Sequence, residues 1–287
     1  MNIKINPIWI IGCGDIGRRV ARLYPNQTIH AVVRTKDSAA LNLKADLMSH
    51  IVDLDTDYTL PETDLENAQI FYFSPPPTEG KQDTRLLKFT EEIKDQPQRI
   101  VLISTTGVYG DSQGKWIDEN TPVYPVADRA HRRLSAESTL IKWAKKYQKE
   151  YMILRIPGIY ATDRLPLARL KKGLAVVNSA EAGWTNRIHA DDLAQACKAA
   201  MQCEQANQII NVCDGNPSTM TDYFNAVADF AGLPRPPQIS MQEAAQTLSS
   251  GMVSYLKESR RIRNQKMLEE LNITLQYPSL EIALKAN

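Results

Sequence analysis

The sequence predicts an α/β fold, in which a doubly wound parallel sheet is followed by a smaller C-terminal lobe. Over the first half of the chain, short runs of β-branched and aromatic residues alternate with longer amphipathic segments. The short runs are apolar almost throughout, as expected for the strands of a parallel sheet that helices cover on both faces. Beyond Pro157 the alternation becomes looser, which indicates a second, smaller unit.

The expected elements alternate between strands and helices along the chain. The expected strands of the sheet are PIWII, IHAVV, HIVDL, QIFYF, RIVLIS, YMILRI and, later, QIINVCD. The expected helices follow Gly14, or cover LLKFTEEI, about 128–148, DDLAQACKAAMQ and about 264–271. On this basis the sheet domain comprises residues 1–155, with 186–214 returning to it, and the lobe comprises 156–185 and 215–287.

The composition excludes several classes of partner. The chain has 287 residues, 43% of them hydrophobic and 23% charged, which is enough for one large core with a smaller lobe. A net charge of +1 supplies no general field for nucleic acid or an anionic membrane. The N-terminus has no basic lead or cleavage site, and no apolar run is long enough to span a bilayer, so we expect a cytoplasmic protein. The four cysteines form no CxxC pair and the four histidines are scattered, so we expect neither disulfides nor a metal site.

A glycine motif lies between the first expected strand and the first expected helix. The segment IIGCGDIGRRV places Gly12, Gly14 and Gly17 in the pattern GxGxxG. These glycines permit a tight turn, close approach of the backbone to a pyrophosphate, and close packing of the helix, whose N-terminus faces the phosphates. The pattern therefore predicts a Rossmann-type dinucleotide site. Its turn consists of Gly12, Cys13, Gly14, Asp15, Ile16 and Gly17.

Residues at the ends of later strands indicate which dinucleotide is bound. The strand IHAVV is followed by Arg34, where a site that prefers NAD would carry an acidic residue, and a guanidinium suits the 2′-phosphate of NADP. We therefore expect NADP, with NAD possible, although Arg34 and Lys36 also fit ordinary exposed charges. Asp53 is placed to contact the adenine or to cap a turn. Ser74 and Pro75 begin a stiff rim that lies along the cofactor or simply ends a strand.

Five segments resemble the extended, and in part atypical, short-chain dehydrogenase/reductase superfamily, in particular the bacterial NAD-dependent epimerase/dehydratase-like group. These segments are ISTTGVYGDSQGKWIDENTP, RIPGIY at 155–160, NRIHADDLA at 186–194, INVCDGNPST at 210–219 and RRIRNQKMLEELNITLQYP. They occur in the family's order and span nearly the whole chain. The resemblance implies that Pro157, within RIPGIY, lies beside the cofactor.

The resemblance also implies catalytic roles for particular positions. In the family a Ser or Thr orients the reacting group, the Tyr of YxxxK is the general acid and base, and its Lys binds the ribose. Thr105 matches the Ser/Thr position, although a threonine at a strand end also bonds its own backbone. The segment RRLSAE matches the family's SKLxAE, which places Arg133 at the Lys position and Arg129 at the Tyr position.

The two arginines have two interpretations. Arg133 is a charged donor that can keep the ribose-binding role of the lysine. Arg129 cannot act as an acid near neutral pH, so its role would be to clamp an anionic substrate. The alternative is a solvated helix face, because Asp128 with Arg132 and Arg133 with Glu137 have the i,i+4 spacing of surface ion pairs.

The sequence shows no single replacement for the missing tyrosine as general acid and base. Tyr109, His131 and His189 are candidates, but each also fits packing or an exposed surface. The resemblance places four further residues near the substrate, and their character suits a phosphate or carboxylate. These four residues are Arg187, His189, Arg260 and Arg261.

The sequence thus predicts an NAD(P)-binding oxidoreductase, or an epimerase/dehydratase-like enzyme, that acts on a small polar substrate. A sugar nucleotide or another anionic molecule fits the arginines. The alternative is a non-catalytic protein that senses NADP(H), for which loss of the Tyr and Lys is the expected mark. In both cases we expect a monomer or homodimer with no nucleic-acid or membrane partner.

Overall fold

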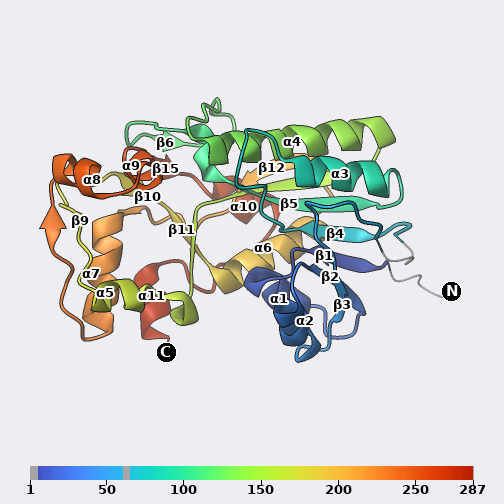
Figure 1. Cartoon of the computed structure of the whole chain (residues 1–287), viewed down its shortest axis with the longest axis horizontal. Coiled ribbons are helices and arrows are strands. Elements are labelled where there is room, and N and C mark those ends of the chain that lie inside the picture. The colour runs from blue at the N-terminus through green and yellow to red at the C-terminus, as the bar shows by residue number, and fades with distance from the viewer. Residues whose placement is uncertain (1–5, 61–64, 287) are drawn as a thin grey trace.

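A seven-stranded parallel sheet forms the centre of the molecule in the computed structural model, which describes residues 6–60 and 65–286. Its order is β12-β7-β5-β4-β1-β2-β3, so the chain winds outward from β1 in both directions (Figure 1). The predicted α/β class and the doubly wound parallel sheet are confirmed. The strands are β1 (Ile8–Ile11), β2 (Ile29–Val33), β3 (Met48–Ile51), β4 (Gln69–Tyr72), β5 (Arg99–Thr105), β7 (Glu150–Ile156) and β12 (Gln208–Asn211).

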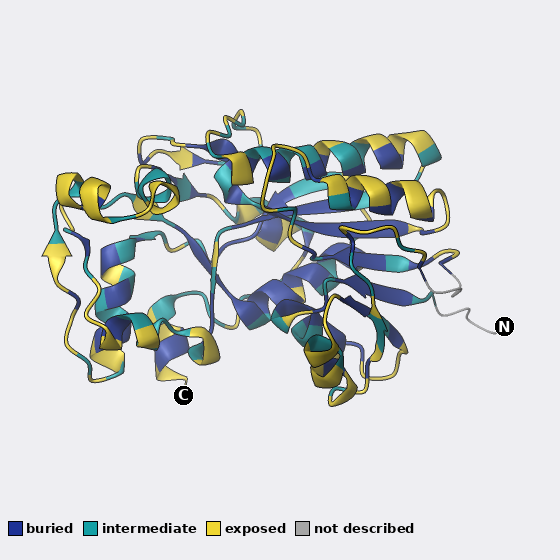
Figure 2. Ribbon diagram, in the orientation of Figure 1, coloured by how far each residue is buried: buried dark blue, intermediate teal, exposed yellow. Residues whose placement is uncertain are grey.

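Helices cover both faces of this sheet, and a separate apolar core lies under each layer (Figures 1 and 2). On one face lie α3 (Thr84–Ile93) and α4 (Asp128–Tyr147), and on the other α1 (Asp15–Arg22) and α6 (Ala190–Gln202), while α2 (Lys36–Leu43) packs beside β3. In α4, Ala136, Leu140, Trp143 and Ala144 are all buried. Their spacing of three and four places them on one helix face, which explains why this segment packs as a helix against the sheet.

The remaining elements form a smaller group beside the sheet, at the left of Figure 1. Its helices are α5 (Leu167–Lys171), α7 (Met220–Phe230), α8 (Met241–Thr247), α9 (Ser250–Leu256) and α11 (Leu280–Lys285). In contrast, α10 (Gln265–Glu270) packs on β12, and Met267 is buried in the core beneath α1 and α6. The segment at α10 therefore returns to the sheet, within the range 215–287 that the sequence assigned to the lobe, and α11 rejoins the smaller group by packing on α7.

Four short strand pairs and two 3₁₀ turns among the described residues lie outside the central sheet. The pairs are β8 (Gly158–Tyr160) with β11 (Arg187–His189), β9 (Val176–Val177) with β14 (Gln238–Ile239), β10 (Trp184–Thr185) with β13 (Ser218–Thr219), and β6 (Trp116–Ile117) with β15 (Arg261–Ile262). The 3₁₀ turns are η1 (Thr106–Tyr109) and η2 (Thr162–Arg164). None of the helices in the described part of the chain is both long enough and apolar enough to cross a bilayer.

Candidate functional site

The glycine turn between β1 and α1 needs glycine at two positions for steric reasons. Gly12 has a φ of +82°, and a Cβ there would lie 2.5 Å from the backbone nitrogen of Ser74. A Cβ on Gly17 would lie 3.0 Å from the sulfur of Cys13. At Gly14 a Cβ would meet no atom within 4 Å, so the approach to the N-terminus of α1 is open. This open cradle fits a pyrophosphate at the first turn of the helix.

Two other residues of the turn direct their side chains into the core. Cys13 and Ile16 both belong to the apolar cluster beneath α1 and α6. Burial raises the pKa of the Cys13 thiol to about 12, so this cysteine stays protonated and unreactive. Only the backbone of these residues is available to a ligand.

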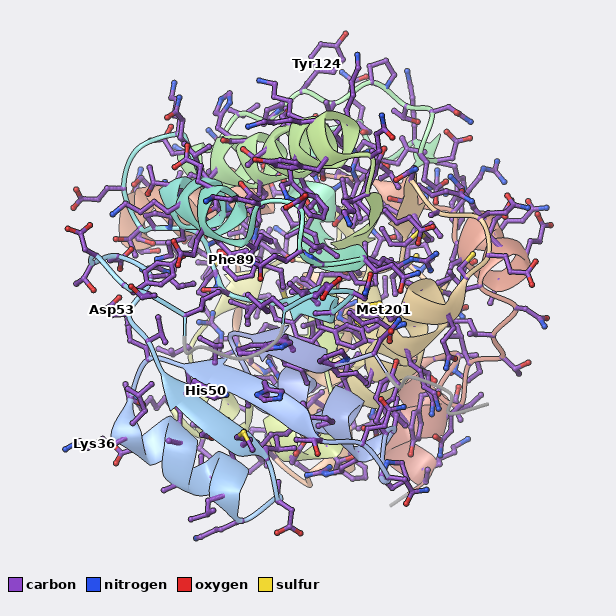
Figure 3. The ribbon with its side chains drawn as sticks, turned by 90° about the vertical axis from the view of Figure 1, so that its right-hand side faces the viewer. Lys36, His50, Asp53, Phe89, Tyr124 and Met201 are labelled. Carbon is purple, nitrogen blue, oxygen red and sulfur yellow. The ribbon has the colours of Figure 1, made fainter. Side chains whose placement is uncertain are left out.

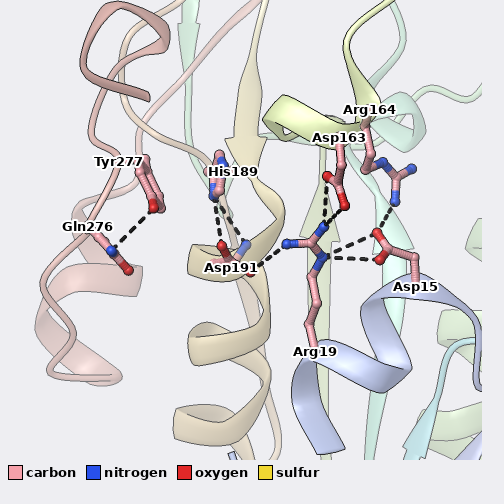
Figure 4. A network of polar contacts seen from close by, with 8 residues as sticks. All are labelled: Asp15, Arg19, Asp163, Arg164, His189, Asp191, Gln276 and Tyr277. Carbon is pink, nitrogen blue, oxygen red and sulfur yellow. Dashed lines mark hydrogen bonds and ion pairs between the residues drawn. The ribbon is translucent and has the colours of Figure 1, made fainter. Parts of the chain in front are cut away.

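Asp15, the first residue of α1, takes part in a network of ion pairs (Figure 4). The Nη1 atom of Arg164 donates to its Oδ2 at 2.6 Å, and Nε of Arg19 donates to its Oδ1 at 3.1 Å. Arg19 also donates to Asp163 at 2.7 Å and to Asp191 at 2.6 Å. Burial by itself raises the pKa of Asp15, but the hydrogen bonds and charges of the two arginines outweigh it and lower that pKa. The network joins the glycine turn to η2 and to the start of α6.

The residues expected to select the dinucleotide lie at the ends of β2 and β3. Arg34 is exposed directly after β2 and has no ion-pair partner among the residues described. Lys36 extends into solvent, and it lies near the same edge of the molecule as Asp53 (Figure 3). Oδ1 of Asp53 accepts a hydrogen bond from the backbone nitrogen of Asp55 at 3.0 Å. Asp53 therefore caps a turn here, as its alternative interpretation requires.

A cavity of about 490 Å³ opens at the carboxyl ends of β5 and β7. Thr105 and Ile156 are paired in register at the ends of these strands. The segments that follow both strands therefore leave the sheet and enter the cavity wall. Six segments build the wall. They comprise residues 75–78, 103–107, 129–133 (without His131), 156–158, 184–186 and three positions from the C-terminal part of the chain, Tyr255, Glu258 and Arg260. The expected site residues in this wall are Pro75, Thr105, Arg129, Arg133, Pro157 and Arg260.

The stretch at the start of α4 brings three arginines to this cavity. Nη1 of Arg133 donates to the carbonyl of Ile103 at 3.0 Å, and burial lowers the pKa of Arg133. Arg132 donates to the carbonyl of Gly80 at 2.7 Å, while its buried Nε has no partner in the described part of the chain. The side chain of Arg129 is 44% exposed. This arrangement differs from a solvated helix face, in which all three would point to water.

Positively charged side chains outnumber negatively charged ones in the cavity wall. It contains four arginines, Arg129, Arg132, Arg133 and Arg260, but Glu258 is the single acidic residue among the described residues that line it. Glu258 accepts a hydrogen bond from Arg260 at 2.8 Å and lies 3.9 Å from Nη2 of Arg129. The surplus of positive charge favours an anionic ligand.

Thr105 lines the cavity and also bonds its local backbone, because its Oγ1 accepts a hydrogen bond from Gly107 at 3.2 Å. Behind it, Oγ of Ser104 donates to Glu137 at 2.5 Å. Glu137 in turn is held by Arg155, with 2.7 Å between Nη2 and Oε2. Glu137 therefore pairs with Arg155 on β7 and not with Arg133, because it faces the sheet.

Tyr109 and His131 do not line the cavity. Tyr109 is 1% exposed, its hydroxyl donates to Oδ1 of Asn211 at 2.9 Å, and burial raises its pKa. His131 lies half-buried on α4, outside the cavity wall. The hydroxyl of Tyr109 is bonded to Asn211 in the core, so it is not placed to donate a proton into the cavity.

Three of the four residues expected near the substrate lie behind or beside the wall. Arg187 is buried and donates to Ser218, Thr185 and the carbonyl of Thr219. The ring of His189 packs against Tyr277, with 3.8 Å between centroids, and its Nδ1 accepts from the backbone of Asp191. Arg261 lies over the rings of Trp116 and Trp184 and donates to the carbonyl of Gly114. These three side chains are held by contacts within the fold, whereas the sequence placed them near the substrate. Of the four residues, only Arg260 lines the cavity.

The comparisons with known proteins agree with this architecture. The model of the NAD dependent epimerase/dehydratase family matches residues 82–213, which include β5, α4 and β7. Residues 82–213 are therefore similar to this family. The resemblance inferred from the five sequence segments is thereby confirmed.

Individual proteins resemble the chain over most of its length. YeeZ of Escherichia coli K12 is 27% identical over 249 residues, which are 84% of this chain and 81% of YeeZ. A conserved protein from Silicibacter pomeroyi, whose function is described as unknown, is 27% identical with a TM-score of 0.86 over 98% of each chain.

Sugar-nucleotide epimerases share the fold at lower sequence identity. UDP-glucuronic acid 4-epimerase from Bacillus cereus, solved in complex with NAD, is 16% identical with a TM-score of 0.76, over 98% of this chain and 97% of that one. UDP-glucose 4-epimerase from Thermotoga maritima, solved with UDP-glucose, is 17% identical with a TM-score of 0.77, over 98% and 96%. Both likenesses concern the fold.

Proposed function

We propose that this protein, which is similar to the NAD dependent epimerase/dehydratase family over residues 82–213, binds a nicotinamide dinucleotide, with NADP preferred over NAD, and acts as an oxidoreductase or epimerase on a small anionic substrate. The observation that carries the proposal is the excess of four arginines over one glutamate in a cavity next to the glycine turn. The structural relatives solved with NAD and with UDP-glucose support a sugar nucleotide as the class of substrate.

The chain offers a set of contacts for the dinucleotide. The pyrophosphate would lie at the open side of Gly14, and Arg34 would bind a 2′-phosphate. Ser74, Pro75 and Pro157 would lie along the cofactor, and Asp53 would lie near the adenine. Arg133 would contact the ribose. When bound, the dinucleotide supplies a hydride donor or acceptor.

The substrate would occupy the remainder of the cavity. Thr105 would orient the reacting hydroxyl or carbonyl, because its side chain lies at the end of β5 in the wall. Arg129 and Arg260 would hold the anionic part of the substrate. Arg187, His189 and Arg261 would support the wall through the contacts described above and would not touch the substrate.

Titration calorimetry tests the cofactor part of the proposal. We expect NADP to bind more tightly than NAD, and Arg34→Asp to narrow or reverse the difference, because it replaces the cation that would contact the 2′-phosphate. Equal affinity of the unmodified protein for both dinucleotides would contradict the preference. Failure to bind either dinucleotide would contradict the proposed function.

A second measurement tests the anionic substrate. With NADP bound, Arg129→Gln should weaken the binding of UDP-glucuronic acid by about 10–100-fold, the range expected when a hydrogen bond to a charged group is lost. Arg263→Gln is the matched control, because Arg263 is exposed and lies outside the cavity wall. An equal effect of the two substitutions would show that the arginines of the cavity do not select the ligand.

The observation that Arg129 and Arg133 occupy the Tyr and Lys positions favours one alternative, a protein that senses NADP(H) without catalysis. Arg133→Ala should weaken dinucleotide binding in either case. A sensor would bind NADP and NADPH with different affinities but turn over none of the candidate substrates, which separates the two functions.

A further inference from the structure

We propose that Tyr255, on helix α9, is the proton donor and acceptor of the cavity, in place of the tyrosine that is missing at position 129. This inference rests on the proposed function, because a proton donor is required here only if hydride is transferred to or from a substrate. It assigns a catalytic role to the C-terminal part of the chain, far in sequence from the start of α4.

The composition of the cavity wall leaves few candidates. Guanidinium groups keep their protons near neutral pH, and the hydroxyls of serine and threonine do not release theirs without a base. Among the described residues that line the cavity, only Glu258 and Tyr255 belong to types that exchange a proton between about pH 4 and pH 10.

Glu258 already has a structural partner. Its Oε2 accepts a hydrogen bond from Arg260 at 2.8 Å, and its Oε1 lies 3.9 Å from Arg129. The side chain is 7% exposed, so little of the carboxylate is open to a ligand. Glu258 therefore serves as the countercharge that positions the two arginines.

Tyr255 has no such commitment. It lies in the cavity wall, half-buried, and its hydroxyl makes no hydrogen bond to another residue in the described part of the chain. A phenol that lines a cavity without a partner is free to bond a ligand there. In this respect it contrasts with Tyr109, whose hydroxyl is occupied by Asn211 in the core.

A buried cation lies directly behind the cavity wall. Arg187 donates to Thr185, itself part of the cavity wall, at 3.0 Å, and it has no ion-pair partner within 4.0 Å among the described residues. Burial lowers the pKa of Arg187, and the negative charge of an ionised Tyr255 is the largest influence in the opposite direction. Arg187 is therefore a positive charge behind the cavity wall, which favours negative charge in the cavity.

The proton balance of a reduction follows from this placement. As the carbonyl carbon of the substrate gains a hydride, the π electrons of the C=O bond move to oxygen. That oxygen takes the phenolic proton of Tyr255, which becomes a phenolate and then takes a proton from water. In the oxidation, the phenolate accepts the proton of the substrate hydroxyl as the carbon loses its hydride.

The first test compares Tyr255→Phe with Tyr124→Phe in turnover of UDP-glucose and UDP-glucuronic acid with NAD and NADP. Tyr124 is the matched control, because it is 70% exposed, extends into solvent (Figure 3) and does not line the cavity. We expect Tyr255→Phe to lower kcat about 100-fold or more, with KM changed less than threefold, because the proton transfer is lost and the arginines remain. Tyr124→Phe should leave both constants unchanged.

The outcomes separate the two proposals. Turnover by the unmodified protein that survives in Tyr255→Phe would overturn the role of Tyr255 and leave the proposed function intact. Absence of turnover by the unmodified protein with every pair of substrate and cofactor would overturn both.

The second test does not depend on turnover. We would place 3-fluorotyrosine at position 255, and in a control at position 124, and follow the ¹⁹F resonance with pH in the NADP⁺ and NADPH complexes. The positive nicotinamide ring of NADP⁺ favours a phenolate next to it, so the label at 255 should ionise at lower pH with NADP⁺ than with NADPH. The label at 124 should ionise at the same pH in both complexes. Identical titrations of the label at 255 would overturn the proposal.

Discussion

The glycine turn and the cavity lie next to each other at the carboxyl edge of the sheet but are assembled differently. Six consecutive residues, 12–17, form the turn, and their conformation depends on close contacts between backbone atoms. The cavity takes its wall from six segments spread between residues 75 and 260. Arg132 and Arg133 in this wall are held by the carbonyls of Gly80 and Ile103, which are distant in the chain. We therefore expect substitutions in the turn to act through steric clashes, and substitutions around the cavity to act through lost charge interactions.

The largest expected effect concerns the ion pair behind the cavity. Glu137 and Arg155 are 2% and 5% exposed, so Glu137→Gln leaves a buried guanidinium without its countercharge. We expect the free energy of unfolding to fall by about 3–5 kcal/mol, measured by denaturation in urea. Glu281→Gln breaks an exposed i,i+4 pair with Lys285 and should cause no measurable change. If the two variants lost comparable free energy of unfolding, the buried ion pair behind the cavity would stabilise the fold no more than an exposed pair does.

The next effect concerns a carboxyl group behind the wall, near Arg187. Burial raises the pKa of Asp214 from its ordinary value of 3.8 to about 7. Because the folded state then binds more protons than the unfolded state between about pH 4 and pH 7, stability should fall as pH rises through this window. Over the whole window this loss amounts to about 2–4 kcal/mol.

Asp214→Asn removes the titrating group. The unfolding free energy of this variant should therefore change little between pH 4 and pH 7, apart from the titration of other groups, which the unmodified protein shares. Urea denaturation of both proteins at a series of pH values measures the difference. A parallel pH dependence in the two proteins would contradict the assignment of the raised pKa to Asp214.

At the glycine turn we expect a smaller effect with a steric origin. Gly12→Ala forces a Cβ against the backbone of Ser74 at a positive φ, which should cost about 1–3 kcal/mol of stability and abolish dinucleotide binding. Gly14→Ala, where a Cβ meets nothing, should fold with nearly unchanged stability. If the two variants lost the same stability, the backbone contact with Ser74 would not be the reason for the glycine.

These differences explain which features could be predicted from the sequence. The alternating apolar segments predicted seven strands, of which the third, HIVDL, is displaced because β3 runs from Met48 to Ile51. The GxGxxG pattern located the turn, because both signals lie within a few neighbouring residues. Arg129 and Arg133 were found from their position in RRLSAE. In contrast, Tyr255 and Glu258 reach the cavity only through folding of the C-terminal part, and no local pattern marked them.

The contacts of Arg187, His189 and Arg261 within the fold were not predicted, for a related reason. The resemblance placed their segments near the substrate, but the direction of each side chain depends on partners elsewhere in the fold, such as Ser218 and Tyr277. The same holds for Glu137, whose i,i+4 spacing from Arg133 suggested a helix-surface pair. Its partner is Arg155 on β7, which sequence spacing along α4 cannot indicate.

The smallest expected effect joins the two regions through Asp15, which belongs to the glycine turn and pairs with Arg164 of η2. Its side chain is 35% exposed and that of Arg164 is 37% exposed, so solvent screens the pair and we expect Asp15→Asn to cost less than about 1 kcal/mol at pH 7.

The pH dependence of this pair should have the opposite sign to that of Asp214. The pKa of Asp15 is lowered in the folded protein, so its contribution is fully present above the ordinary value of 3.8 and is lost as pH falls through the lower folded value. Unfolding curves of Asp15→Asn and the unmodified protein should therefore differ at pH 7 and converge as pH falls below the ordinary value of 3.8 and through the lower folded value. A difference that persisted undiminished at low pH would mean that Asp15 stabilises the turn by its shape and not by its charge, as the rest of the turn does.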